Sequence, residues 1–302
     1  MWTRIIFLFL IVILSESMGY GELSMKPNGV NVLRISPDPR GEAMGGVGVG
    51  FCGVNAAGLY WNPASLSGIE KKELCLMHNE WITDLQYEFI GVCLPIKDNY
   101  LGLSTAYLHM DRIDGRDEDR NKISYESYDL VNSIFYARAF QYYGCGVSLK
   151  AISSKISDEY ASAMGMDIRM VYNMDERIGY GISLNNIGLK PYRFIEVSDS
   201  LPLNLRFGGY YKNKQGLLSC IEWVKEREKD ITVACGLEYE IFKGYKDNNL
   251  YLRAGYNSGR EKRIGCGIGI KHSRFSVDYS YKSGNSWLGD THHVSMNLEC
   301  GK

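Results

Sequence analysis

Residues 264–282 read IGCGIGIKHSRFSVDYSYK and contain two segments in which every second residue is apolar. In the first segment the intervening residues are glycines, and in the second they are Ser276, Asp278 and Ser280. Side chains of a β-strand alternate between its two faces, so each segment has one apolar and one polar face. Residues 271–274 form a short join, so the pattern predicts two adjacent antiparallel strands.

The same alternation recurs along most of the chain. It is clearest after residue 163, where the runs are about nine to eleven residues long, the length of a tilted transmembrane strand. With residues 264–271 and 275–282, the predicted strands number about fourteen. The others lie near residues 71–79, 85–95, 99–110, 126–140, 143–153, 163–172, 178–185, 203–210, 216–225, 231–239, 250–257 and 294–300.

Three features favour a membrane barrel over a soluble sandwich, which would show the same alternation. The polar faces carry charges and glycines, as a wet lumen would. Aromatic residues often end the apolar faces, where an interfacial girdle would lie. Short joins also alternate with longer ones: the short joins lie at 96–99, 141–142, 173–177, 213–216 and 271–274, and the longer ones at 111–124, 154–162, 188–202 and 283–290. The joins at 80–84 and 242–249 fit this alternation poorly.

Lipid offers no partners to backbone groups, so a sheet inside a bilayer must close on itself. The sequence therefore predicts an all-β fold, a transmembrane antiparallel β-barrel spanning residues 70–302. The charged run EWVKEREKD at residues 222–230 is helix-like in composition, but we expect it in a hairpin loop in water.

Composition agrees with this fold class and excludes others. The 302 residues include 34 Lys and Arg against 35 Asp and Glu, so a general nucleic-acid binder, which needs a basic face, is not expected. Gly at 33 and Tyr at 22, with only 7 Pro, suit strands, tight turns and aromatic girdles. The expected partner of the outer surface is outer-membrane lipid.

The first 21 residues, MWTRIIFLFLIVILSESMGYG, have the features of a cleaved signal peptide. Arg4 precedes an apolar run from Ile5 to Leu14 that is too short to span a bilayer as a helix, and small residues follow it. A membrane anchor and a buried helix are the alternatives. We expect export from the cytoplasm and a final location in the bacterial outer membrane.

Residues 43–69 carry no charge and read AMGGVGVGFCGVNAAGLYWNPASLSGI. Glycine and proline disfavour a helix, so a membrane-spanning helix is not expected here. The formal GxGxxG at residues 48–53 lacks the strand and helix of a dinucleotide site. We expect a compact segment, residues 22–69, buried within the larger structure.

No catalytic, metal or cofactor site is expected. The eight cysteines form no CxxC, and they are predicted to be small apolar strand residues rather than a disulfide framework. No Gly-x-Ser-x-Gly is present to supply a hydrolase nucleophile. The acidic run at residues 111–119 lacks EF-hand spacing and includes compensating arginines, which favours a solvated loop over a Ca²⁺ site.

Charged residues on the polar faces are predicted to point into the lumen, since facing lipid would cost about 2–4 kcal/mol each at the midplane. We expect them to pair across the barrel, with tuning of a permeation path as the alternative. They are Asp167, Arg169, Arg206, Glu238, Arg253 and Asp278.

Residues 31–66 resemble the N-terminal signature of the PorV/PorQ family, outer-membrane proteins whose barrel is similar to that of the FadL transporters. The resemblance lies in RGEAMGG at residues 40–46, NAA at 55–57 and YWNPA at 60–64. Further similar blocks are HNEW at 78–81, YEF at 87–89, IDGRDE at 113–118, LPLNLR at 201–206 and GDTH at 289–292. The chain departs from the pattern at its end, LECGK, which lacks a terminal aromatic residue.

This resemblance implies a fourteen-stranded barrel with an N-terminal hatch, or plug, in the lumen. The hatch residues that it implies are Gly45, Gly46, Asn55, Asn62, Pro63 and Ala64. It also implies two functions. One is transport of hydrophobic small molecules across the outer membrane. The alternative is a structural or cargo-shuttle component of type IX secretion, with secretion-system proteins as partners. An outer-membrane hydrolase is a distant third, and no enzymatic activity is expected.

Overall fold

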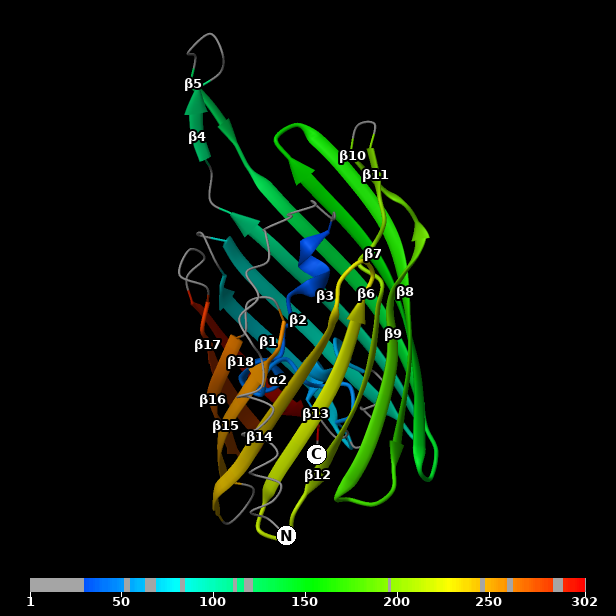
Figure 1. Cartoon of the computed structure of the whole chain (residues 1–302), viewed down its shortest axis with the longest axis vertical. Coiled ribbons are helices and arrows are strands. Elements are labelled where there is room, and N and C mark those ends of the chain that lie inside the picture. Colours follow the sequence, from blue (N-terminus) through cyan, green and yellow to red (C-terminus); the bar gives the residue numbers. More distant parts are fainter. Residues whose placement is uncertain are drawn as a thin grey trace.

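The computed structural model describes residues 30–51, 55–62, 69–81, 85–110, 113–116, 122–194, 197–244, 248–259, 263–284 and 290–301. Within these residues 14 strands form one closed antiparallel barrel (Figure 1). The expected signal peptide, residues 1–21, lies outside the described residues. The barrel strands are β1 (Lys72–Glu80), β2 (Leu85–Ile96), β3 (Asn99–Met110), β6 (Ser127–Ala139), β7 (Tyr143–Ile156), β8 (Glu159–Asn173), β9 (Ile178–Lys190), β12 (Asn204–Lys212), β13 (Leu217–Glu226), β14 (Ile231–Lys243), β15 (Asn249–Asn257), β16 (Arg263–His272), β17 (Phe275–Lys282) and β18 (Thr291–Cys300).

The barrel closes where its last strand pairs with its first. Met77 of β1 lies opposite Ser295 of β18, and on its other side β1 pairs with β2. Two small hairpins interrupt the sequential order of the strands. β4 (Ile113–Arg116) pairs with β5 (Lys122–Tyr125), and β10 (Tyr192–Phe194) pairs with β11 (Val197–Asp199). Both hairpins lie at the upper end in Figure 1.

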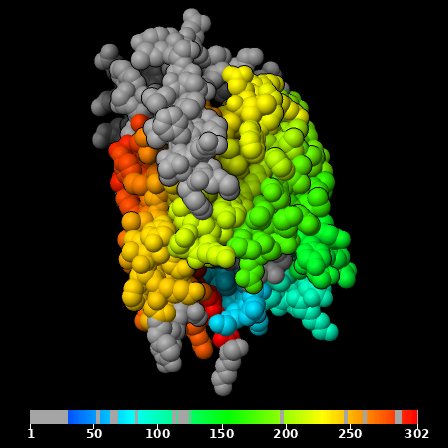
Figure 2. Space-filling view, turned by 60° about the horizontal axis from the view of Figure 1, so that its bottom comes forward, coloured from blue at the N-terminus to red at the C-terminus, as the bar shows by residue number. Residues whose placement is uncertain are grey.

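The alternation in residues 264–282 gives the predicted hairpin, and its apolar side chains point outward. Ile268 of β16 lies opposite Tyr279 of β17. Ile264 is 61% exposed, whereas Asp278 on the inner face is 4% exposed. A surface with exposed aliphatic side chains and buried charges is the reverse of a soluble protein and suits contact with lipid. Figure 2 shows the strands from β8, in green, to β16, in orange, as one continuous outer face.

The inside of the barrel holds residues 30–51 and 55–62, which we call the luminal segment. It contains the short helices η1 (Asn31–Arg34), α2 (Pro39–Ala43) and η2 (Ala56–Leu59). α2 lies against β15–β18, and η2 lies against β1–β3 (Figure 1). The luminal segment therefore lies inside the barrel, against the inner face of these strands.

The structure corrects two expectations. β7 runs to Ile156 and β8 starts at Glu159, so the longer join predicted at 154–162 is a tight turn. β13 runs to Glu226, so much of residues 222–230 is strand and only the remainder is a hairpin loop. In both places strands continue past the apolar belt, so polar side chains there hide the alternation.

The seven cysteines that the structure describes are all free, and Cys52 lies outside the described residues. Cys75, Cys93 and Cys220 are buried on strands. All seven lie on strands, as expected, but Cys145, Cys266 and Cys300 are exposed, so a packing role inside the protein is seen only for the buried ones.

Across the described ranges, no helix has the length and apolarity needed to cross a membrane.

Ile268→Lys, at the middle of β16, should lower the free energy of unfolding in phospholipid vesicles by about 2–4 kcal/mol, because it places a charge in lipid. His272→Lys, at the end of the same strand, should change it by only about 0–1 kcal/mol. Urea unfolding followed by tryptophan fluorescence measures both changes. Equal losses for the two variants would contradict the orientation of this wall.

Candidate functional site

The luminal segment is organised around Asp38, which caps the N-terminus of α2. Its carboxylate accepts hydrogen bonds from the backbone N–H groups of Arg40, at 3.1 Å, and Gly41, at 3.0 Å. It also accepts one from the indole N–H of Trp61, at 2.9 Å. Burial raises the pKa of Asp38 to about 6, although the nearby Arg40 charge opposes the shift. This one side chain therefore joins α2 to the last turn of the described segment.

Glycines let the backbone of the luminal segment touch the inner wall directly. Gly45 has φ of 85°, a left-handed conformation that favours glycine, and a Cβ there would lie 2.5 Å from the carbonyl oxygen of Tyr256. On the wall, a Cβ at Gly255 would lie 2.0 Å from the carbonyl carbon of Met44. The fit at β15 is therefore set by main chain against main chain.

A chain of ion pairs joins α2 to three strands of the wall. Arg40 Nη2 lies 2.7 Å from Glu238 Oε1 of β14. Arg253 of β15 lies 2.7 Å from Glu238 and 2.6 Å from Asp278 of β17. Each charge thus has an opposite partner at close range, as burial requires.

Glu42 forms a separate ion pair at the end of α2. Its carboxylate lies 2.5 Å from Lys282 Nζ of β17. Burial acts to raise the pKa of Glu42, but the Lys282 charge and neighbouring cationic groups outweigh it and hold the pKa below its usual value.

Glu222 of β13 binds the glycine-rich part of the luminal segment. Its carboxylate accepts the backbone N–H groups of Gly48, at 2.8 Å, and Val49, at 3.0 Å, and it also pairs with Arg206 of β12. Arg206 donates to the carbonyl of Gly46 at 2.7 Å and lies 4.5 Å from the Trp61 ring centroid. β12 and β13 therefore both bind the same stretch of the luminal segment, residues 46–49.

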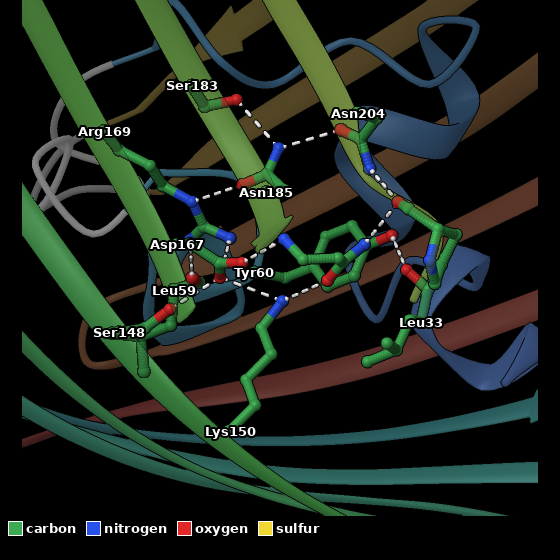
Figure 3. A network of polar contacts seen from close by, with 12 residues as sticks. Leu33, Leu59, Tyr60, Ser148, Lys150, Asp167, Arg169, Ser183, Asn185 and Asn204 are labelled. Carbon is green, nitrogen blue, oxygen red and sulfur yellow. Dashed lines mark hydrogen bonds and ion pairs between the residues drawn. The ribbon is translucent and has the colours of Figure 1, made fainter. Parts of the chain in front are cut away.

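Figure 3 shows a further polar network on β7–β9 and β12. Asp167 lies 2.9 Å from Lys150 and 2.6 Å from Arg169, and it accepts a 2.5 Å hydrogen bond from Ser148. Arg169 also donates to the carbonyl of Leu59 at 2.8 Å. Because Leu59 belongs to η2, this network also ties the wall to the luminal segment.

The remainder of that network surrounds a void of about 10 Å³, enough for roughly one water molecule. Asn185 accepts from Arg169 at 2.7 Å and donates to Ser183 and Asn204. Tyr60 donates to the carbonyl of Leu33 at 3.2 Å, and burial raises the pKa of its hydroxyl. The polar groups here are packed against one another, with no wide opening between them.

Another part of the interior is apolar. One contiguous cluster joins η1 and η2 to the inner faces of β1–β3 and β6–β8, to Tyr192 of β10 and to Leu201. Leu33, Val131, Ile152, Ala163 and Leu201 belong to it, and all are at most 6% exposed. The luminal segment therefore contacts charged residues of the wall in one part of the interior and apolar residues in another.

The six charged residues predicted to face the lumen all lie on the inner face. Asp167 and Arg169 meet each other, Arg206 meets Glu222, and the remaining three join in the Arg40 chain. Five of the six are buried, and Arg206 is half-buried. Glu238, Arg169 and Arg206 bond to the luminal segment directly. Asp167, Arg253 and Asp278 are linked to it through these residues.

Four of the six residues implied for the hatch lie within the described residues. Gly45 and Gly46 both have positive φ after α2. Asn55 caps η2 by accepting the Ala57 N–H at 3.1 Å, and Asn62 donates to the carbonyl of Val49 at 2.9 Å. The other two, Pro63 and Ala64, lie outside the described residues.

The sequence reasoning missed Glu222, Lys150 and the three charged residues of α2 and its cap. Lys150 lies between Leu149 and Ala151, and the alternation of β7 could have placed it inside. Asp38, Arg40 and Glu42 lack any periodic signal, because they belong to short helical turns. Among the described residues, no group of three or more His, Cys, Asp or Glu could hold a metal ion.

No family model and no curated protein sequence matches this chain. Solved structures do match it in fold. The toluene transporter TodX of Pseudomonas putida superposes with a TM-score of 0.63 at 12% identity, covering 86% of this chain and 95% of that one. CymD, a monoaromatic hydrocarbon channel, gives 0.62 at 13% identity, with 87% and 97% coverage.

A FadL homologue of Pseudomonas aeruginosa gives a TM-score of 0.57 at 11% identity, covering 87% of this chain and 98% of that one. The chain therefore has the fold of FadL-like outer-membrane barrels over nearly the full length of these structures. At such low identity the likeness concerns the fold alone.

Glu222→Ala should lower the free energy of unfolding by about 3–5 kcal/mol, because it leaves Arg206 and two buried N–H groups without their acceptor. Urea unfolding measures the loss, and limited proteolysis should cut the luminal segment faster. Glu228→Ala, at an exposed position in the loop after the same strand, is the control and should change neither. Identical behaviour of the two variants would contradict the role given to Glu222.

Proposed function

We propose that this protein is an outer-membrane channel for hydrophobic small molecules. The observation that carries the proposal is the apolar cluster between the luminal segment and one side of the wall. Hydrophobic ligands are held by concave apolar surfaces, and an inner barrel wall is otherwise expected to be polar. The fold shared with TodX and CymD supports the proposal, since those two are a toluene transporter and a hydrocarbon channel.

In this proposal residues 22–69 form the hatch and residues 70–302 form the barrel. The many ion pairs and direct backbone contacts of the luminal segment support a closed resting state. Residues 1–21 would be removed during export, and the exposed aliphatic belt would then lie in the outer membrane. The described residues Gly45, Gly46, Asn55 and Asn62 would hold the hatch fold.

Ala163→Trp should abolish most uptake of radiolabelled toluene by cells that produce the protein, because a large ring would fill the apolar cluster from the inner face of β8. Ala151→Trp adds the same ring to the outer face of β7, one strand away, and should leave uptake unchanged. Folding of both variants is checked by heat-modifiable migration in detergent gels. Equal uptake by the two folded variants, or no uptake by the parent protein, would rule out this path.

A second candidate is a structural or cargo-shuttle component of a type IX secretion system. The PorV/PorQ-like blocks at residues 40–46, 55–57 and 60–64 favour it. The closely packed interior also suits a protein that acts through its surface. In this reading the hairpins β4–β5 and β10–β11 would offer contacts to other proteins.

Chemical cross-linking in native membranes, followed by purification of the cross-linked protein, tests the second candidate. A large translocon should co-purify if the protein belongs to a secretion system. Recovery of the protein alone, with toluene uptake intact, would exclude this candidate and leave the channel.

A further inference from the structure

Six polar side chains on the inner face of β17, β18 and β1 are buried without a hydrogen-bond partner. Both amide atoms of two asparagines and both ring nitrogens of a histidine are among these unpartnered atoms. Each of the six residues is at most 4% exposed. They are Asn79, Ser280, Thr291, His293, Ser295 and Asn297.

These side chains form one row. Four of them occupy every second position of β18 from Thr291 to Asn297, a length of about 20 Å along the strand. His293 is paired with Asn79 on one side and with Ser280 on the other. We call the six residues the β18 row.

The luminal segment is held mainly on other strands. Its ion pairs and hydrogen bonds reach β14 through Arg40, β17 through Glu42 and β13 through Gly48. Its backbone also packs directly on β15 at Gly255 and on β9 at Gly181. In the described residues, α2 lies against β18 but forms no hydrogen bond or ion pair with it.

A buried polar group without a partner is unfavourable, and nearly all such groups in proteins are bonded to protein or water. The closed arrangement offers the β18 row no hydrogen-bond partner from the protein, so water or a hydroxylated solute is the partner that these groups can take. Separation of α2 from the row requires the Glu42–Lys282 ion pair on β17 to break, whereas the anchors on β13, β14 and β15 can keep the luminal segment attached to the wall.

We propose that the β18 row is a track for water and small uncharged hydroxylated solutes, opened when the luminal segment separates from β18. Amides, hydroxyls and an imidazole offer alternating donors and acceptors to such solutes. The six residues carry no carboxylate or ammonium group. Asp278 and Lys282, which are paired with Ser295 and Thr291 on β17, are each held in an ion pair, so the row itself offers hydrogen bonds. The row borders the apolar cluster, since Met77 and Cys75 of the cluster pair with Ser295 and Asn297. Its groups are polar, however, and the proposal does not depend on hydrocarbon transport.

The test is the swelling rate of liposomes that contain the full-length protein in isotonic arabinose. The double variant Ser295→Ala/Asn297→Leu should swell about fivefold more slowly than the parent, because two sets of hydrogen bonds to the solute are lost. The control Asn132→Leu/Ser133→Ala makes the same changes on β6 and should swell at the parental rate. The single variant Ser295→Ala, a smaller change, should show an intermediate rate.

Two results would overturn the proposal. One is a parental swelling rate no higher than that of protein-free liposomes. The other is an unchanged swelling rate of the double variant together with a raised melting temperature. That result is expected if neither water nor solute reaches the β18 row, because apolar side chains are then better tolerated there than unpartnered polar ones. Toluene uptake by the same variants is measured separately and should be unchanged, so failure of the hydrocarbon function is distinguishable from failure of this one.

Discussion

The closure of β1 on β18 is the constraint on which the remaining structure depends. A sheet in lipid has no water to bond its edges, so every strand needs two neighbours. Fourteen strands meet that need only if the first and last pair, as Lys72 does with Cys300 at the end of the ladder. Once closed, the wall has a lipid-facing surface and an enclosed interior, and each residue belongs to one or the other.

The interior then sets its own requirement. Charged side chains on the inner face are removed from bulk water and need partners. The luminal segment supplies some of them, through Arg40 to Glu238 and Glu42 to Lys282. Elsewhere the charged residues of the wall pair with one another, as Asp167 does with Arg169. The luminal segment thus occupies space inside the barrel and also supplies opposite charges to the charged residues of the wall.

The sequence was enough to predict the strands because period-two alternation is local. It also placed Asp167, Arg206 and Arg253 on the inner face, since alternation fixes the face of every residue in a strand. Their partners could not be predicted, because Arg40 and Glu238 are separated by 198 positions and nothing periodic links them. Glu222 was missed because the charged run at residues 222–230 was assigned to a loop, although the strand predicted near residues 216–225 already included it.

The order of the strands has a consequence for how the molecule is made. The strand that closes the barrel, β18, is synthesised after the other barrel strands, whereas the luminal segment is made before β1. The barrel wall is closed, and main-chain contacts at Gly255 hold the luminal segment against it. The luminal segment therefore could not easily be inserted through the side of a finished barrel. We therefore expect the sheet to fold around the luminal segment. The pairing of β18 with β1 then closes the barrel with the luminal segment inside.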